Sequence, residues 1–275
     1  MPVEMSERQP ELRRDPISGR WVIISSARGK RPVVSTPRRE EESPEVRERC
    51  PFCYGKEHLT PLEIYSFRPD NTPANHPGWQ VRVVPNKYPA FGIFPEVYVR
   101  RLGLSQIATG YGAHEVVVDS PDHERYLEQQ PLEHIVHIVD AWWLRHVDLE
   151  RDPQLRYVLI FKNHGKDAGA SLSHPHEQII ATTIIPNLLK AKLEFARSHF
   201  VNGEGCIWCR QLDQLYLYEA TIWNPDGSVF LQTRRGDRIV SENSHFVAFI
   251  PFAARMPYEI HIHRVTRGRY RPFVP

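Results

Sequence analysis

Residues 174–178, which read HPHEQ, carry the side chains best suited to chemistry. His174, His176 and Gln178 stand at alternate positions at the head of a β-branched, apolar run. In a β-strand, alternate side chains lie on one face. This arrangement allows one histidine to be fixed by a metal ion while its neighbour acts as a nucleophile. Gln178 could then donate a hydrogen bond to the group under attack.

These residue types suit phosphoryl transfer. An imidazole nitrogen attacks phosphorus readily near neutral pH, where a large fraction of histidine is unprotonated. The phosphoramidate-type product is labile enough to pass its group on, so the enzyme must supply chiefly positioning and charge stabilisation. Taken alone, His-x-His is more often a strand with two surface histidines. The preceding loop has a backbone that can approach phosphate oxygens, because it contains Gly165, Gly169, Ser171 and Ser173.

The four cysteines form two Cys-x-x-Cys pairs, at Cys50/Cys53 and Cys206/Cys209. In an intracellular chain this spacing indicates metal or redox chemistry rather than structural disulfides. A thioredoxin-like pair would open a helix after a strand, whereas these pairs follow a charged linker and a glycine-containing turn. We predict two separate zinc sites, because the pairs are far apart and the 14 histidines offer further ligands.

The composition argues against several classes of protein. The chain has 275 residues, of which 41% are hydrophobic, enough for one large core or two packed halves. Its net charge of +2 does not favour a polyanion binder, and no basic, aromatic-rich motif accompanies the cysteines. No apolar run approaches a membrane span, and residues 1–20 lack a signal-peptide core. We expect a cytoplasmic protein without nucleic-acid or membrane partners.

The hydrophobic pattern predicts an α+β fold rich in antiparallel strands. Helices are expected from Ser120, as N-cap, to about His146, and over 186–199. Each cysteine pair precedes a strand, a proline-containing turn and a second strand with histidine, which indicates a duplicated domain. Strands are predicted from Trp21, from the two histidines, and over 80–84, 111–119, 156–161, 216–223, 229–234, 245–251 and 258–263.

Several motifs follow one another along nearly the whole chain. They are DPISGRWVIISSARGKRP, CPFC, VVPNKYPAF, SPDH, FKN with its glycine–serine loop, HPHEQ, and FVAFIPFAARMPYE. Together they resemble galactose-1-phosphate uridylyltransferase and its nucleotidyltransferase relatives, in the histidine-triad superfamily. The resemblance implies two histidine-triad-like halves with antiparallel sheets and flanking helices. Residues 1–186 would form the catalytic half with a zinc site, and residues 187–275 the C-terminal half.

The resemblance also implies roles for individual residues. His176 would be the nucleophile that becomes nucleotidylated, and Gln178 would contact the transferred phosphoryl group. One zinc ion would be bound by four residues, Cys50, Cys53, His123 and His174. Substrate contacts would come from Asn163 and Ser171 at the phosphates, Arg28 and Arg31 nearby, and Asn86 in the nucleotide pocket.

The implied reaction is ping-pong transfer of UMP from UDP-glucose to galactose 1-phosphate through uridylyl-His176, in a protein expected to be a homodimer. An alternative within the family is an adenylyl-transferring relative that uses ADP-glucose with phosphate as acceptor, and the second cysteine pair favours it somewhat. Another alternative is a non-catalytic protein that binds zinc and nucleotide. The complete set of His176, Gln178 and Asn163 argues against that last alternative.

The second metal site departs from the pattern of the bacterial uridylyltransferases. Lys192 stands near the place where they carry a glutamate that binds a second metal. Instead, Cys206, Cys209 and His245 resemble the second zinc site of the adenylyltransferase-like relatives. Its fourth ligand would normally come from further along the chain.

The end of the sequence also departs from the family. After PYEIHI the chain reads HRVTRGRYRPFVP, which is basic and has no strand or helix pattern. We expect an incomplete second half, in which the second zinc lacks a ligand unless His261 or His263 substitutes. The first half-reaction would then survive better than the full transfer.

Overall fold

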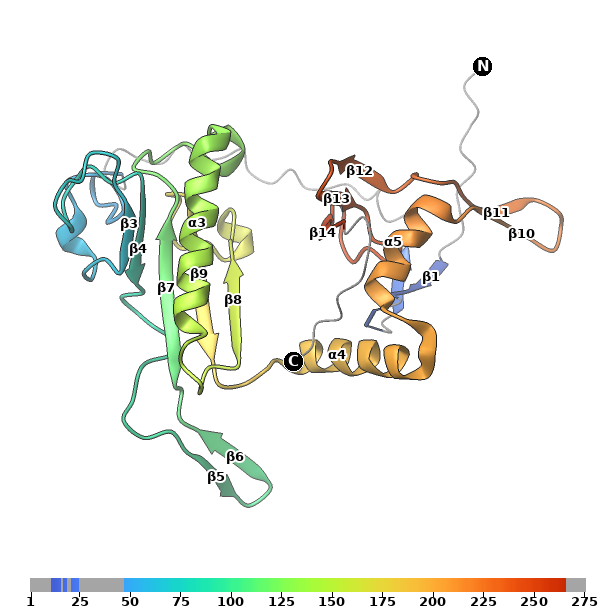
Figure 1. The fold of residues 1–275 in the computed structure, drawn as a ribbon, viewed down its shortest axis with the longest axis horizontal. Helices are drawn as coiled ribbons and strands as arrows, with labels where there is room; N and C mark the ends of the chain where they lie inside the picture. The colour runs from blue at the N-terminus through green and yellow to red at the C-terminus, as the bar shows by residue number, and fades with distance from the viewer. Residues whose placement is uncertain (1–10, 16, 19–20, 25–46, 266–275) are drawn as a thin grey trace. The chain divides into compact units, whose positions relative to one another are not determined.

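The computed structural model describes residues 11–15, 17–18, 21–24 and 47–265 (Figure 1). They belong to two compact units. One unit lies within residues 37–185, and the other joins residues 186–275 to the N-terminal segment that ends at residue 36. The predicted division into residues 1–186 and 187–275 stays a prediction, because the strands near the N-terminus group with the second unit.

A five-stranded antiparallel sheet forms the centre of the first unit (Figure 1). Its middle strands are rich in valine and isoleucine, whose β-branched side chains favour extended backbone. In spatial order, the strands are β3 (Tyr65–Phe67), β4 (Val81–Pro85), β7 (Gly112–Val118), β9 (His176–Thr182) and β8 (Tyr157–Phe161).

The sheet buries both of its faces. Helix α3 (Leu132–Leu149) covers one face, and Ile138 and Ala141 of this helix pack among the odd-numbered strand residues Val81, Val83, Val117, Ile179 and Ala181 (Figure 1). The opposite face packs the even-numbered residues Val84, Val116 and Val118 against Cys50, Phe52 and Trp79. His176 pairs with Val118 and Gln178 with Val116, so both belong to the face opposite the helix.

The predicted helix start at Ser120 is wrong, since α3 begins at Leu132 after Pro131. The Ser120 hydroxyl instead accepts a hydrogen bond from the Asp122 backbone N–H, at 3.2 Å, and closes a local turn. The chain then makes a 3-10 turn, η2 (Leu127–Gln129), before the helix. A serine suits either a helix cap or such a turn. The local sequence cannot distinguish the two, because the segment after Ser120 is held by contacts with distant residues.

Ion pairs are buried on the helix side of the sheet. The Arg145 guanidinium of α3 makes two 2.7 Å hydrogen bonds to the Glu115 carboxylate of β7. Lys162 bridges Asp119 and Glu177, and burial, with Asp119 adding to it, raises the pKa of Glu177 to about 9. Because residue 177 faces away from residue 176, these charges support the sheet from behind the histidine face.

The second unit contains helices α4 (Asn187–His199) and α5 (Ile207–Leu217), joined through a π-helical turn, η4 (Phe200–Glu204). Small clusters around Ile17 with Ala196 and around Leu215 with Phe249 form its core. The strand predicted from residue 216 begins instead at 220, because α5 continues to Leu217. The strands are β1 (Glu11–Arg14), β2 (Trp21–Ile24), β10 (Ala220–Trp223), β11 (Val229–Thr233), β12 (Ile239–Glu242), β13 (Phe246–Phe249) and β14 (His261–Arg264).

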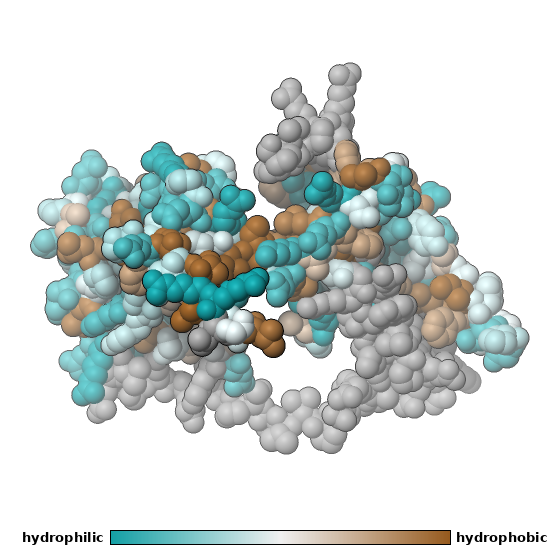
Figure 2. All heavy atoms as spheres, turned by 90° about the horizontal axis from the view of Figure 1, so that it is seen from below, coloured by the Kyte–Doolittle hydropathy of each residue, from teal (hydrophilic) through white to brown (hydrophobic). Residues whose placement is uncertain are grey.

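The remaining elements of the first unit are short. They are two 3-10 turns, η1 (Glu57–Leu59) and η3 (Lys166–Ala168), and the hairpin of β5 (Val99–Leu102) and β6 (Ser105–Ala108). Hydrophilic residues lie among hydrophobic ones on the face seen in Figure 2. Within the described segments, no helix has the length and apolar character needed to cross a membrane. Antiparallel sheets with few helices confirm the predicted α+β class, while duplication of the two halves stays a prediction.

Candidate functional site

Four potential metal ligands meet beside the start of β9. The ligand atoms of Cys50, Cys53, His123 and His174 all lie within 4.8 Å of one another. The Cys53 Sγ atom is 3.3 Å from Nδ1 of His123 and 3.6 Å from Nδ1 of His174, which is also 3.6 Å from Sγ of Cys50. Tetrahedral zinc would separate sulfur and nitrogen ligands by about 3.5 Å. The structure therefore confirms that these four residues form a cluster able to hold a metal.

The ring orientations also suit metal binding. His174 donates from Nε2 to the backbone oxygen of Ser120 at 2.8 Å, which leaves the Nδ1 lone pair facing the two sulfurs. The Nε2 atom of His123 lies 3.0 Å from the Ser173 hydroxyl, so its Nδ1 is likewise turned to Cys53. Metal-binding histidines normally use the second nitrogen in this way.

Burial favours the uncharged forms of Cys50 and His174 in the absence of a cation. It raises the pKa of the Cys50 thiol to about 12 and lowers the pKa of His174 to about 4. The neutral imidazole is the form that binds a metal, whereas the thiols must lose their protons to do so. A divalent cation would favour the thiolates by its charge, so two sulfurs and two imidazoles fit zinc well.

His176 is held as a neutral imidazole with a defined lone pair. Its Nδ1 lies 2.8 Å from the backbone oxygen of His174, which can only accept, so Nδ1 carries the proton and Nε2 the lone pair. Burial lowers the pKa of His176, whose exposed fraction is 9%. The Phe52 ring, from the loop between the two cysteines, packs edge-on at 5.4 Å from the His176 ring. The loop that carries Cys50 and Cys53 therefore also supports the candidate nucleophile, through Phe52.

Gln178 and Asn86, predicted from the sequence as site residues, are joined by a residue that the sequence did not single out. His114 of β7 lies 2.8 Å from Oε1 of Gln178 and 3.1 Å from Nδ2 of Asn86, in both cases through its Nε2 atom. The sequence signal that could have identified His114 is its position two residues before Val116, on the same face of the sheet as Gln178. A histidine in a strand is not distinctive without its cross-strand neighbours.

The loop between β8 and β9 reaches the same end of the sheet as His176. Phe161 pairs with Gln178, so Asn163 and His176 occupy corresponding positions two residues further on. Gly169 has a φ of +89°, and a Cβ atom there would lie 3.7 Å from Nδ2 of Asn163. Ser171 is exposed in this loop. The phosphate contacts predicted for Asn163 and Ser171 stay predictions, while Arg28 and Arg31 fall outside the described residues.

The second cysteine pair opens a helix. Cys206 is the N-cap of α5, and Cys209 follows in its first turn, after the π-helical turn η4 rather than after a strand. Burial and a hydrogen bond with Cys206 raise the pKa of Cys209 to about 12. Across residues 11–15, 17–18, 21–24 and 47–265, Cys50, Cys53, His123 and His174 form the only cluster of three or more potential ligands. His245 is therefore not brought to this pair, and the second zinc site stays a prediction.

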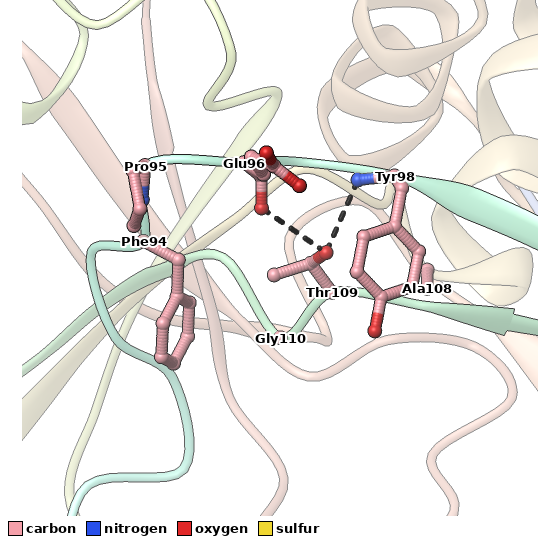
Figure 3. Close-up of a pocket in the computed structure, with 7 residues that line it drawn as sticks. All are labelled: Phe94, Pro95, Glu96, Tyr98, Ala108, Thr109 and Gly110. Carbon is pink, nitrogen blue, oxygen red and sulfur yellow. Dashed lines mark hydrogen bonds between the residues drawn. The ribbon is translucent and has the colours of Figure 1, made fainter.

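A shallow hollow of about 420 Å³ lies at the other end of β7, beside the β5–β6 hairpin (Figure 3). Phe94, Tyr98 and Thr109 line it, and the Thr109 hydroxyl accepts a hydrogen bond from the Tyr98 backbone N–H at 3.1 Å. His176 pairs with the opposite end of β7, at Val118. The hollow is thus separate from the histidine site.

Comparison with known proteins identifies the family. Residues 1–186 match the N-terminal domain of galactose-1-phosphate uridyl transferase. The chain belongs to this family. It is 31% identical over 260 residues to ADP-glucose phosphorylase of Arabidopsis thaliana and 32% identical over 255 residues to galactose-1-phosphate uridylyltransferase of Thermotoga maritima. These alignments cover 94% and 92% of this chain, and in both cases 66% of the relative.

A solved structure agrees with this assignment. The crystal structure of ADP-glucose phosphorylase from Arabidopsis thaliana with bound ADP-glucose superposes with a TM-score of 0.68 at 30% identity, covering 93% of this chain and 68% of that one. The chain spans just under two thirds of the length of the two curated relatives. The family and fold are therefore established, and the reaction of the whole protein is a matter for proposal.

Proposed function

We propose that this protein transfers a nucleoside monophosphate between two phosphate-bearing partners through a covalent intermediate on His176. The observation that carries the proposal is the hydrogen bond from Nδ1 of His176 to the backbone oxygen of His174. It directs the lone pair of a buried, neutral imidazole to Nε2, the form in which histidine is nucleophilic.

The reaction would proceed in two balanced steps. In the first, Nε2 of His176 attacks the α-phosphorus of a nucleoside diphosphate sugar, and the P–O bond to the sugar 1-phosphate breaks with its electron pair going to the leaving oxygen. In the second, a phosphate oxygen of the acceptor attacks the same phosphorus, and the P–N bond breaks to restore the lone pair on Nε2. Each step is a displacement at phosphorus that requires alignment and charge stabilisation.

The other site residues would stabilise charge and position the substrate. Gln178, on the face of His176, would donate to an oxygen of the transferred phosphoryl group. Asn163 and Ser171 would contact phosphates from the loop before β9, with Arg28 and Arg31 supplying positive charge. Zinc on the cysteine–histidine cluster would be structural, since four protein ligands fill its coordination. It would fix the loop whose Phe52 ring supports His176.

UDP-glucose is the first candidate donor, with galactose 1-phosphate as acceptor, in line with the family and the 32% identity to the Thermotoga maritima uridylyltransferase. ADP-glucose with phosphate as acceptor is the second. It is favoured by the likeness to ADP-glucose phosphorylase in sequence and structure, and by the second cysteine pair. Both candidate reactions use the chemistry assigned to His176. They differ only in the nucleotide that the pocket accepts and in the acceptor.

An exchange experiment tests the proposal without any acceptor. Labelled glucose 1-phosphate is incubated with the protein and unlabelled UDP-glucose or ADP-glucose. Reversal of the first step then places label in the nucleotide sugar, which is the signature of a ping-pong covalent intermediate. We expect exchange with at least one of the two donors. Failure of the label to exchange with either, in folded protein with bound zinc, would contradict the covalent route from these donors.

A further inference from the structure

We propose that His114 is a positioning residue that holds the amide of Gln178 with its nitrogen turned toward the transferred phosphoryl group. The inference rests on the proposed function, since it assigns a task to Gln178 in that reaction. It adds a residue of β7 to a site otherwise built from β9 and the loops around it.

The hydrogen bonds of the ring determine where its proton lies. The backbone N–H of Ala90 donates to Nδ1 of His114 at 3.0 Å, so Nδ1 presents a lone pair. In a neutral imidazole the proton then belongs to Nε2, and Nε2–H donates to Oε1 of Gln178 at 2.8 Å. The ring is therefore held from both sides, with a main-chain donor on one nitrogen and the glutamine oxygen on the other.

The backbone around His114 makes the ring a firm anchor. His114 pairs with Ile180 of β9, and its own carbonyl accepts a hydrogen bond from the Asn86 N–H at 2.8 Å. Oδ1 of Asn86 accepts from the Tyr88 N–H at 2.9 Å, which leaves Nδ2 of Asn86 at 3.1 Å from Nε2 of His114. Because both of these nitrogens carry protons, the second distance is a contact and not a hydrogen bond. The loop of residues 86–90 thus fixes the main chain of His114 through the Asn86 N–H and its ring through the Ala90 N–H.

This anchor has a consequence for Gln178. A primary amide carries an acceptor oxygen and a donor nitrogen of similar size, so nothing in its shape prevents it from rotating by half a turn. With Oε1 bound by His114, the NH₂ group must point away from His114. That orientation presents donors rather than an acceptor to a phosphoryl oxygen, which is what developing negative charge requires. Without His114, the amide would also present its oxygen and repel that charge.

Two substitutions at His114 separate hydrogen bonding from packing. His114→Phe keeps a planar ring but removes the donor, and His114→Gln restores a donor at similar reach. We expect His114→Phe to lower kcat for the exchange reaction about 10- to 100-fold, with KM changed less than about threefold, because one oriented charge-stabilising donor is worth that order. His114→Gln should recover most of kcat. Thermal unfolding of each variant checks that the fold is kept.

A double-mutant cycle tests whether His114 acts through Gln178. Gln178→Ala alone should lower kcat about 100-fold or more, and His114→Phe/Gln178→Ala should be no slower than Gln178→Ala, because the group that His114 orients is already gone. His137→Phe is the matched control, since His137 stacks on Phe67 with ring centroids 3.6 Å apart and lies on helix α3. It should leave kcat unchanged.

The outcomes also separate this inference from the proposed function. Suppose that Gln178→Ala is slow, but folded His114→Phe keeps its kcat or His114→Gln fails to recover it. The positioning role of His114 is then wrong, and the covalent mechanism stands. Additive losses in the double variant would likewise overturn it, since His114 would then act independently. If the unmodified protein catalyses no exchange with either donor, or Gln178→Ala is fully active, the proposed function or the role of Gln178 falls, and the inference falls with it.

Discussion

Replacing His176 by alanine is expected to lower kcat for the exchange reaction about ten-thousand-fold or more, because the attacking atom is removed. The remaining site can still bind the nucleotide sugar, so donor binding measured by calorimetry should change little. The loss should be confined to chemistry. The His176 side chain hydrogen-bonds to the His174 backbone oxygen, and its ring packs on Phe52. Truncation therefore leaves the ligand atoms of the metal cluster in place.

The control for this variant is His137→Phe, which alters a histidine on helix α3, on the other side of the sheet from His176. Metal content and unfolding temperature should match the unmodified protein in both variants. Exchange that persists in His176→Ala above about one per cent of the original rate would contradict the assignment, since loss of a covalent nucleophile leaves far less.

Replacing Cys50 or Cys53 by serine is expected to abolish tight zinc binding at the proposed site and to destabilise the first unit strongly. Structural zinc contributes a binding free energy on the order of 10 kcal/mol, and in such sites this energy supports folding. Cys50 is 4% exposed and packs with Phe52, Val84 and Val118, so loss of the ion would disturb the core of the histidine face. Transfer should fall as well, because Phe52 and the His174 carbonyl both position His176.

Metal analysis after extensive dialysis, together with thermal unfolding, measures this effect. The double variant Cys206→Ser/Cys209→Ser is the matched control, because it alters an identical motif that lacks the two histidines. It should keep one zinc per chain and most of the exchange activity. Equal zinc content and unchanged unfolding temperature in Cys50→Ser would refute the cluster as a structural metal site.

Much of the sheet and the two cysteines of the metal cluster could be predicted because their signals are local. The valine-rich run before Pro85 and the run IIAT after Gln178 form the strands β4 and β9, as alternation and β-branching predict. The Cys-x-x-Cys spacing of Cys50 and Cys53 indicates a metal site without further information. Its histidine partners came from the family resemblance, since nothing in spacing links His123 and His174 to residues more than 65 positions earlier.

The parts that were missed depend on contacts between distant segments. Ser120 has the type and the following proline of a helix cap, yet its carbonyl accepts from His174, and the turn delivers His123 to the cysteines. Contacts with distant segments therefore outweigh capping preference at this point. His114 was overlooked for a similar reason. Its importance arises from the strand register that places it beside Gln178 and from the Ala90 N–H that sets its tautomer.

The most direct test of the central claim is the mass of the intact protein after brief incubation with UDP-glucose or ADP-glucose, followed by peptide mapping. The account predicts an acid-labile nucleotidyl adduct on His176 that is absent from His176→Ala, and the mass of the adduct identifies the nucleotide as uridylyl or adenylyl. An adduct on a different residue, or none with either donor in folded protein with bound zinc, would contradict it.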